Sequence, residues 1–226
     1  RYHPENPSTV NNYYPQHGVG AISDFFAEGI IKGGGQIIIG ALVNKIVLDN
    51  HAVRGIHYSM STETKCLDFG SQENNHFRYK VLSTIPVNEL ILMMEGDVPE
   101  AALSAAKELD FTSEVFLYLN VKRPNVFGIP LLYFSEPEFP FNRIYDIGIF
   151  SRKMVPEGKN ALCLEISCIY DDEIWNMDDN ALFNKCLSPL EKHNLLKRQD
   201  IEGYHTKRLK HAYPIFRIGY ENRLNA

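Results

Sequence analysis

Three consecutive glycines, Gly33 to Gly35, interrupt the chain where its hydrophobic pattern changes period. Before them, residues 21–32 place apolar side chains at the spacing of one helical face, which must be buried. That face consists of Ile22, Phe25, Phe26, Gly29 and Ile30. Glycine adopts the left-handed conformation without a Cβ clash and continues a helix poorly, so the helix should end at the glycines. The pattern predicts an amphipathic helix followed by extended chain.

Extended segments are predicted after the glycines. Ile37 to Ile39 are β-branched, Val43 and Ile46 follow, and Asp49-Asn50-His51 reads as a turn before a strand at 53–58. The polar tract 59–76 is predicted to be a turn region with one weak strand, and a further strand is expected at residues 78–84, before Ile85-Pro86. The first part of the chain is thus predicted to be a helix followed by strands.

The remainder of the chain alternates between helical and strand periods. The helical segments are 87–95, 99–109 and 174–196, and the extended ones are 114–122, 127–134, 143–151, 161–169 and 201–209. Pro189 lies inside the last helical pattern, so a kink or a division is expected there. The predicted fold class is α/β of the α+β type, with a mixed, largely antiparallel sheet and flanking helices.

Composition excludes several classes of function. A formal charge of -5 and an isoelectric point near 5.9 argue against a nucleic-acid-binding or anionic-membrane surface. No apolar run approaches the roughly 20 residues that span a bilayer, and there is no signal-peptide pattern, so the cytoplasm is the expected location. Four cysteines without a Cys-x-x-Cys pair are predicted to be buried, reduced thiols. The acidic run 171–173 is interpreted as a helix cap rather than a metal site.

Several short motifs occur in a characteristic order. They are Tyr-Pro-x-x-Gly-x-Gly at 14–20, Val-x-x-Ile at 43–46, Ser-Thr-x-Pro at 83–86, Phe-Asn-Arg-Ile-Tyr-Asp at 141–146 and His-Ala-Tyr-Pro-Ile at 211–215. This order resembles the flavin-containing amine oxidase superfamily, which includes protoporphyrinogen oxidases, phytoene desaturase-like enzymes and UDP-galactopyranose mutases. The later motifs resemble prokaryotic protoporphyrinogen oxidase-like flavoproteins in particular.

The resemblance implies an FAD cofactor and a set of residues that contact it. Val43 matches the position that passes the adenine, and Ser83, Thr84 and Pro86 match the strand end that lies against the dinucleotide. Two strong signals of the superfamily are missing, namely an N-terminal Gly-x-Gly-x-x-Gly turn and a C-terminal Gly-Asp segment. We therefore expect an excised middle portion of a longer enzyme, one that does not bind FAD tightly by itself.

The resemblance also implies a domain organisation. Residues 1–86 would form part of an FAD-binding region, residues 87–215 a substrate-binding domain, and residues 216–226 the return to the FAD-binding domain. In the superfamily, the substrate domain is a mixed sheet that faces the flavin with helices behind it. The strands of residues 1–86 would then belong to an incomplete FAD-binding domain.

Candidate substrate-binding residues follow from the strand at 143–151. Arg143 and Tyr145 are two positions apart and point to one face, where a forked cation and a phenol would suit a diphosphate or a carboxylate. The alternative is a surface arginine that stacks on its neighbour. Tyr14 and His17, in the segment that approaches the flavin in the superfamily, and Tyr213 are further candidates. No catalytic residue is identified.

Three functions remain open at this stage. The first is the central portion of an FAD-dependent oxidoreductase acting on a small molecule, inactive as the isolated chain. The second is a redox-neutral enzyme of the UDP-galactopyranose mutase type, which needs a basic cluster to hold a diphosphate; only Arg143 and Arg152 suggest one. The third is a non-enzymatic binding module. The oligomeric state does not follow from the sequence.

Overall fold

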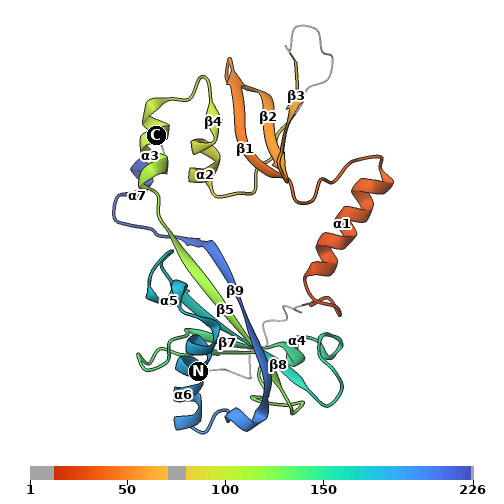
Figure 1. The fold of residues 1–226 in the computed structure, drawn as a ribbon, viewed down its shortest axis with the longest axis vertical. Coiled ribbons are helices and arrows are strands. Elements are labelled where there is room, and N and C mark those ends of the chain that lie inside the picture. The colour runs from red at the N-terminus through yellow and green to blue at the C-terminus, as the bar shows by residue number, and fades with distance from the viewer. Residues whose placement is uncertain (1–12, 71–79, 225–226) are drawn as a thin grey trace, which may run out of the picture. The chain divides into compact units, whose positions relative to one another are not determined.

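The computed structural model describes residues 13–70 and 80–224. Contacts divide the chain into two compact units. The first unit comprises residues 1–36 and 113–210, and the second comprises residues 37–112 and 211–226 (Figure 1). Across the described residues, no helix is both long and apolar enough to cross a membrane.

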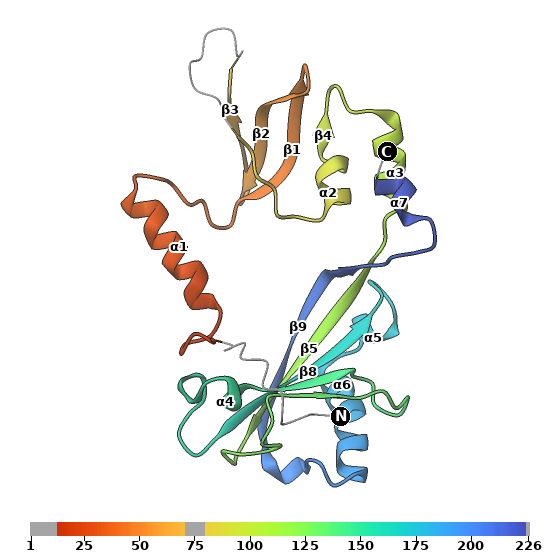
Figure 2. The same ribbon diagram turned by 180° about the vertical axis from the view of Figure 1, so that it is seen from behind.

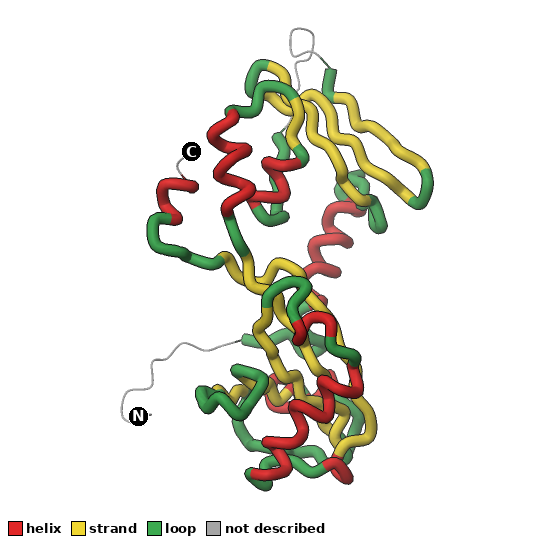
Figure 3. Tube along the Cα trace, turned by 60° about the vertical axis from the view of Figure 1, so that its left-hand side comes forward, coloured by secondary structure: helices red, strands yellow, loops and turns green. Residues whose placement is uncertain are grey.

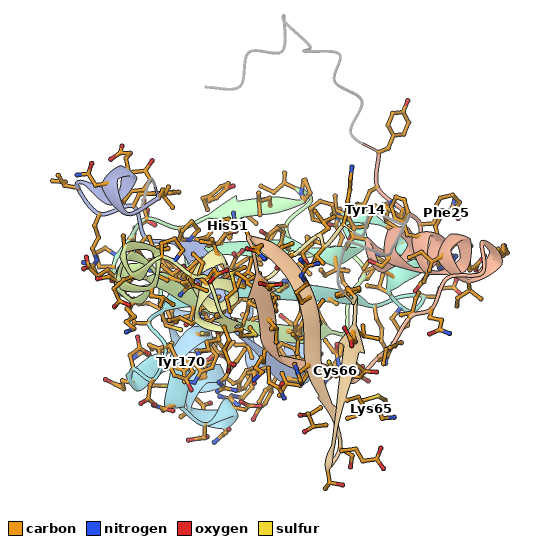
Figure 4. The ribbon with its side chains drawn as sticks, turned by 90° about the horizontal axis from the view of Figure 1, so that it is seen from above. Tyr14, Phe25, His51, Lys65, Cys66 and Tyr170 are labelled. Atoms are coloured by element: carbon orange, nitrogen blue, oxygen red, sulfur yellow. The ribbon has the colours of Figure 1, made fainter. Side chains whose placement is uncertain are left out.

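The second unit contains a four-stranded sheet in the order β3-β2-β1-β4. Its strands are β1 (Leu42–Asp49), β2 (Ala52–Met60), β3 (Glu63–Asp68) and β4 (Met94–Glu95). β1 and β2 form an antiparallel hairpin, as predicted, and Asn50 and His51 adopt positive φ angles of 49° and 58° at its turn (Figure 4). β4 pairs in parallel with β1. The sheet is therefore mixed.

Three helices complete the second unit: α2 (Val87–Leu92), α3 (Glu100–Glu108) and α7 (Tyr220–Leu224). The predicted helix at 87–95 is shorter than expected because residues 94–95 pair with β1. The strand predicted at 78–84 is wrong over residues 80–84, which form no ladder with any described strand, and residues 78–79 lie outside the described part. The alternation of side chains in a segment does not show whether another strand lies beside it to pair with.

The first unit is built on a five-stranded sheet in the order β6-β7-β8-β5-β9. Figure 2 labels β5, β8 and β9 of this sheet. Its strands are β5 (Phe111–Val121), β6 (Leu131–Tyr133), β7 (Arg143–Asp146), β8 (Asn160–Cys168) and β9 (Ile201–Pro214). The pairs β5–β8, β6–β7 and β7–β8 are antiparallel. The predicted strand at 143–151 ends at residue 146, because the chain turns into the short helix α4 (Ile147–Phe150).

The core of the first unit lies between one face of this sheet and helix α6 (Asp179–Lys192), which is one of the helices drawn in red in the lower part of Figure 3. Its buried side chains include Val115, Leu117, Leu119, Ile144, Leu162, Leu164, Ile166, Leu182, Phe183 and Leu190. α6 runs past Pro189 without a break, so the expected division there is wrong. The chain instead divides after α5 (Glu173–Asn176), because Asp178 caps α6 by accepting hydrogen bonds from two backbone N–H groups.

Helix α1 (Gly20–Lys32) forms as predicted and ends at the glycine run. Gly34 has a φ of +82°, and its N–H donates to the Ile31 carbonyl at 3.0 Å. The expected burial of the apolar face is not found among the described residues, since Phe25 and Phe26 are 72% and 63% exposed (Figure 4). The helical period identified the face, but nothing described covers it.

Candidate functional site

The sheet of the first unit presents two different faces, because side chains alternate along each strand. One face forms the core against α6. We call the opposite one the polar face; its residues are Glu114, Phe116 and Tyr118 of β5, Arg143 and Tyr145 of β7, and Cys163, Glu165 and Ser167 of β8. The registers place Arg143 beside Glu165 and Tyr145 beside Cys163. Arg143 and Tyr145 thus share one face, as the sequence predicted.

Arg143 forms a forked ion pair with Glu165. Its Nε donates to Oε2 of Glu165, and its Nη2 donates to Oε1 at 2.6 Å. The Glu165 side chain is 3% exposed and the Arg143 side chain 20% exposed. The guanidinium carbon also lies 5.4 Å from the centre of the Tyr145 ring. The arginine does stack on its neighbour, but a buried carboxylate balances its charge, a feature that sequence reasoning missed.

A second carboxyl group, that of Glu114, lies on the same face and is 1% exposed. The Ser167 hydroxyl donates to its Oε1 at 2.6 Å, whereas Oε2 has no hydrogen-bond partner in the described part of the chain. Burial raises the pKa of the Glu114 carboxyl above its usual range; the Ser167 hydrogen bond opposes this, and the nearby Glu165 carboxylate adds to it. Glu114 therefore holds its proton more strongly than an exposed glutamate.

Aromatic side chains border the ion pair. The ring centres of Tyr14 and Phe150 are 5.1 Å apart, and those of Phe150 and Tyr145 are 6.3 Å apart. We call Tyr14, Phe150 and Tyr145 the aromatic row. All three side chains are only partly buried. The row joins two predicted substrate residues through Phe150, which the sequence did not identify because α4 was read as the end of a strand.

The segment before α1 is fastened to the first unit near α4. The Ser151 hydroxyl donates to the Gln16 carbonyl at 2.6 Å, and the Gly18 N–H donates to the Pro15 carbonyl at 3.0 Å. Gly18 has a φ of +88°, and a Cβ there would lie 3.1 Å from the Met154 methyl group. The left-handed φ favours glycine in this turn, and a Cβ would also push the Met154 methyl group aside by a few tenths of an ångström. His17 is exposed in the same turn.

The polar face offers no activated thiol. Burial raises the pKa of Cys163 to about 12, and that of its neighbour Tyr118 likewise to about 12. Tyr118 stacks on His205 with the ring centres 4.8 Å apart. Cys163, Cys168 and Cys186 are buried free thiols, as predicted, but Cys66 on the edge strand β3 is exposed, so that prediction was wrong for this residue. A nucleophilic role for Cys163 is not supported.

The predicted cofactor residues all lie in the second unit. Val43 lies in β1 and is 37% exposed, Ser83 and Thr84 are exposed in irregular chain, and Pro86 precedes α2. Among the described residues, no backbone hydrogen bond is found for 81–85. The assignment of these residues to FAD therefore stays a prediction.

Other parts of the second unit bear on ligand binding as well. Pro86 lines an apolar pocket of about 240 Å³ together with Leu109, Phe111, Ile215 and Phe216. Tyr213 also belongs to this unit, and its N–H donates to Thr112 Oγ1 at 3.3 Å. In neither unit do the described residues bring together three side chains able to hold a metal ion. Asp172 caps α5 through the Trp175 N–H, which confirms the cap interpretation.

Comparisons with known proteins find solved structures that share this fold. No family model and no curated protein matches the chain. A reduced UDP-galactopyranose mutase matches 94% of this chain and 43% of its own, at 24% identity and a TM-score of 0.73. A protein assigned as a protoporphyrinogen oxidase from an Exiguobacterium species matches 92% of this chain and 42% of its own, at 15% identity and a TM-score of 0.62.

A double mutant of putrescine oxidase gives a similar result, with 12% identity over 92% of this chain and 44% of its own, and a TM-score of 0.61. The chain therefore spans less than half the length of these solved structures. At such identities the likeness concerns the fold alone. The resemblance predicted from the sequence is confirmed at that level: the chain has the fold of the matching part of these solved structures, which include a UDP-galactopyranose mutase and a protein assigned as a protoporphyrinogen oxidase.

Proposed function

We propose that this chain is the central, substrate-binding portion of an FAD-dependent oxidoreductase of the cytoplasm. The polar face carries the proposal. It belongs to a sheet whose other face packs on α6, and it presents an ion pair and the aromatic row where a small molecule could lie. A rigid sheet backed by a helix holds such side chains in fixed positions, as a binding site requires. The fold, shared with flavoenzymes, supports the assignment.

In this proposal the cofactor supplies the redox chemistry by accepting a hydride equivalent from the substrate. Val43, Ser83, Thr84 and Pro86 would contact FAD, and residues 1–86 and 216–226 would belong to the FAD-binding region. Because the chain lacks the Gly-x-Gly-x-x-Gly turn that holds a pyrophosphate, we expect weak FAD binding by the chain alone.

The substrate would lie against residues 87–215. Arg143 and Tyr145 would orient it, with Tyr14 at the edge of the site; His17 and Tyr213 remain candidates. Each of the three first-named side chains contacts another member of the group or Phe150, which limits its rotamers. Such restriction lowers the entropy cost of binding.

A redox-neutral mutase would need free cations for a diphosphate. Both arginines that suggested this function already have protein acceptors. Arg143 pairs with Glu165, and Arg152 donates to the Pro124 carbonyl at 2.9 Å and to the Lys159 carbonyl at 3.0 Å. This favours the oxidoreductase over the mutase.

The test compares this chain with the product of its complete reading frame. We expect the complete product to retain flavin on purification, and this chain to leave the fluorescence of added FAD nearly unchanged in a titration. A complete product that neither retains nor binds flavin would refute the proposal and favour the binding-module alternative. Tight FAD binding by this chain alone would contradict the role assigned to the missing turn.

A further inference from the structure

Glu165 controls the charge that Arg143 can offer to a ligand. Two of the guanidinium nitrogens, Nε and Nη2, point at the two carboxylate oxygens of Glu165. This is the same fork that would bind a phosphate or a substrate carboxylate. With Glu165 in place, an anionic ligand must compete with a carboxylate that is already positioned and 3% exposed.

The charges around Arg143 add no attraction for an anion. The ion pair itself is neutral, since one guanidinium faces one carboxylate. Glu114, another acidic residue of the polar face, lies close enough to Glu165 for the two carboxyl groups to interact. These three described side chains offer a phosphate no net positive charge, and in a site of low dielectric constant this costs more than in water.

The aromatic row offers a different kind of contact. Tyr14, Phe150 and Tyr145 follow one another with ring-centre separations of 5.1 and 6.3 Å. Partly buried rings at this spacing attract another ring through offset or edge-to-face packing and through the apolar area that is buried. The surface next to the neutral ion pair is therefore suited to an uncharged planar molecule.

We propose that Glu165 is a specificity-determining residue: by holding Arg143 it excludes phosphorylated and other anionic ligands from the polar face, and so leaves the aromatic row to an uncharged planar ring. This inference deepens the proposed function and rests on it for the identity of the site. It replaces the diphosphate and carboxylate substrates considered from the sequence with an uncharged ring-bearing class.

Two probes that share one ring system test the inference in the unmodified chain. Naphthol and naphthyl phosphate are titrated separately, and binding is followed through NMR shifts of tyrosine and phenylalanine ring protons. Naphthol should bind at least about tenfold more tightly than its phosphate ester, a difference of about 1.4 kcal/mol. Phe150→Ala should weaken naphthol binding. Equal affinities for the two probes, or naphthol binding that is unchanged in Phe150→Ala, would overturn the inference.

The variant Glu165→Gln tests the role of the carboxylate directly. Freed from its partner, Arg143 should hold the phosphate group, and the preference for naphthol should fall by about tenfold or more. The matched control is Glu202→Gln, which also frees a cation in the same unit, because both Glu202 oxygens accept from Lys159 at 2.8 and 2.6 Å. That control should leave the preference unchanged.

The outcomes separate this inference from the proposed function. If Glu165→Gln and Glu202→Gln change the preference equally, general charge rather than Glu165 sets the selectivity, and the inference fails. Circular dichroism checks that Glu165→Gln folds; if it does not, the probe pair on the unmodified chain still decides. Neither titration involves flavin, so a complete product without flavin would refute the proposed function while leaving these measured preferences as they stand.

Discussion

Replacing Glu114 by glutamine should remove a specific part of the pH dependence of stability. The Glu114 carboxyl is 1% exposed, and its Oε2 has no partner among the described residues. Burial, the largest cause, raises its pKa in the folded state, with Glu165 adding to the rise and Ser167 and Arg143 opposing it. The folded chain therefore binds the Glu114 proton more tightly than the unfolded chain does.

The sign of the effect follows from this difference. Below the unfolded-state pKa of about 4.3, both states carry the proton and the contribution of Glu114 to stability is fully present. As the pH rises from there through the raised folded-state pKa, the unfolded chain releases the proton first, so the free energy of unfolding falls. The size of this fall is set by the difference between the folded-state and unfolded-state pKa values, at about 1.4 kcal/mol for each unit.

Urea unfolding at pH 5 and pH 8, followed by the fluorescence of Trp175, measures this loss. Trp175 is the chain's single tryptophan and packs in the same unit as Glu114. The wild type should lose stability between the two pH values, and Glu114→Gln, which cannot ionise, should lose less, by about 1.4 kcal/mol for each unit by which folding raises the Glu114 pKa. Ser167→Ala removes the hydrogen bond that opposes the rise and should enlarge the loss. An equal loss in the wild type and Glu114→Gln would refute the reasoning.

Three further predictions concern the same chain. Arg143→Gln leaves the buried Glu165 carboxylate without its cation and should lower the free energy of unfolding by about 3 kcal/mol. Adding Glu165→Gln should restore most of this free energy, as measured by urea unfolding. Gly148→Ala would place a Cβ against the Asn160 carboxamide and should lower stability by about 1–3 kcal/mol in the same assay; an unchanged midpoint would contradict the packing. Cys66 should be the one thiol among the four that reacts rapidly with a thiol reagent in the folded chain, and simultaneous reaction of the three buried thiols would show that the core opens.

Local signals predicted the elements that depend on neighbouring residues alone. The glycine run ended α1, and the turn at 49–51 formed the hairpin. The errors arose where a distant element decides the outcome. Residues 80–84 lack a partner strand, and Cys66 is exposed because β3 is a sheet edge. Neither fact can be read from the period of a segment.

The apolar face of α1 is a second case in which the pattern of a segment does not predict its tertiary contacts. The spacing of its apolar residues predicted a buried face that carries Phe25 and Phe26. Both remain mostly exposed in the described structure. A helical period indicates that burial of one face is favourable, but it does not indicate which other surface packs against that face.

Strand register decides the chemistry of the polar face. From sequence, Arg143 was a cation available to an anionic substrate, because its partner lies 22 positions away. Antiparallel pairing of β7 and β8 places Arg143 opposite Glu165. A slip of one residue would turn Glu165 toward the core and bring Leu164 or Ile166 to the polar face. Arg143 would then lose the carboxylate that balances its charge, so the register that buries the core also determines which class of ligand the polar face can bind.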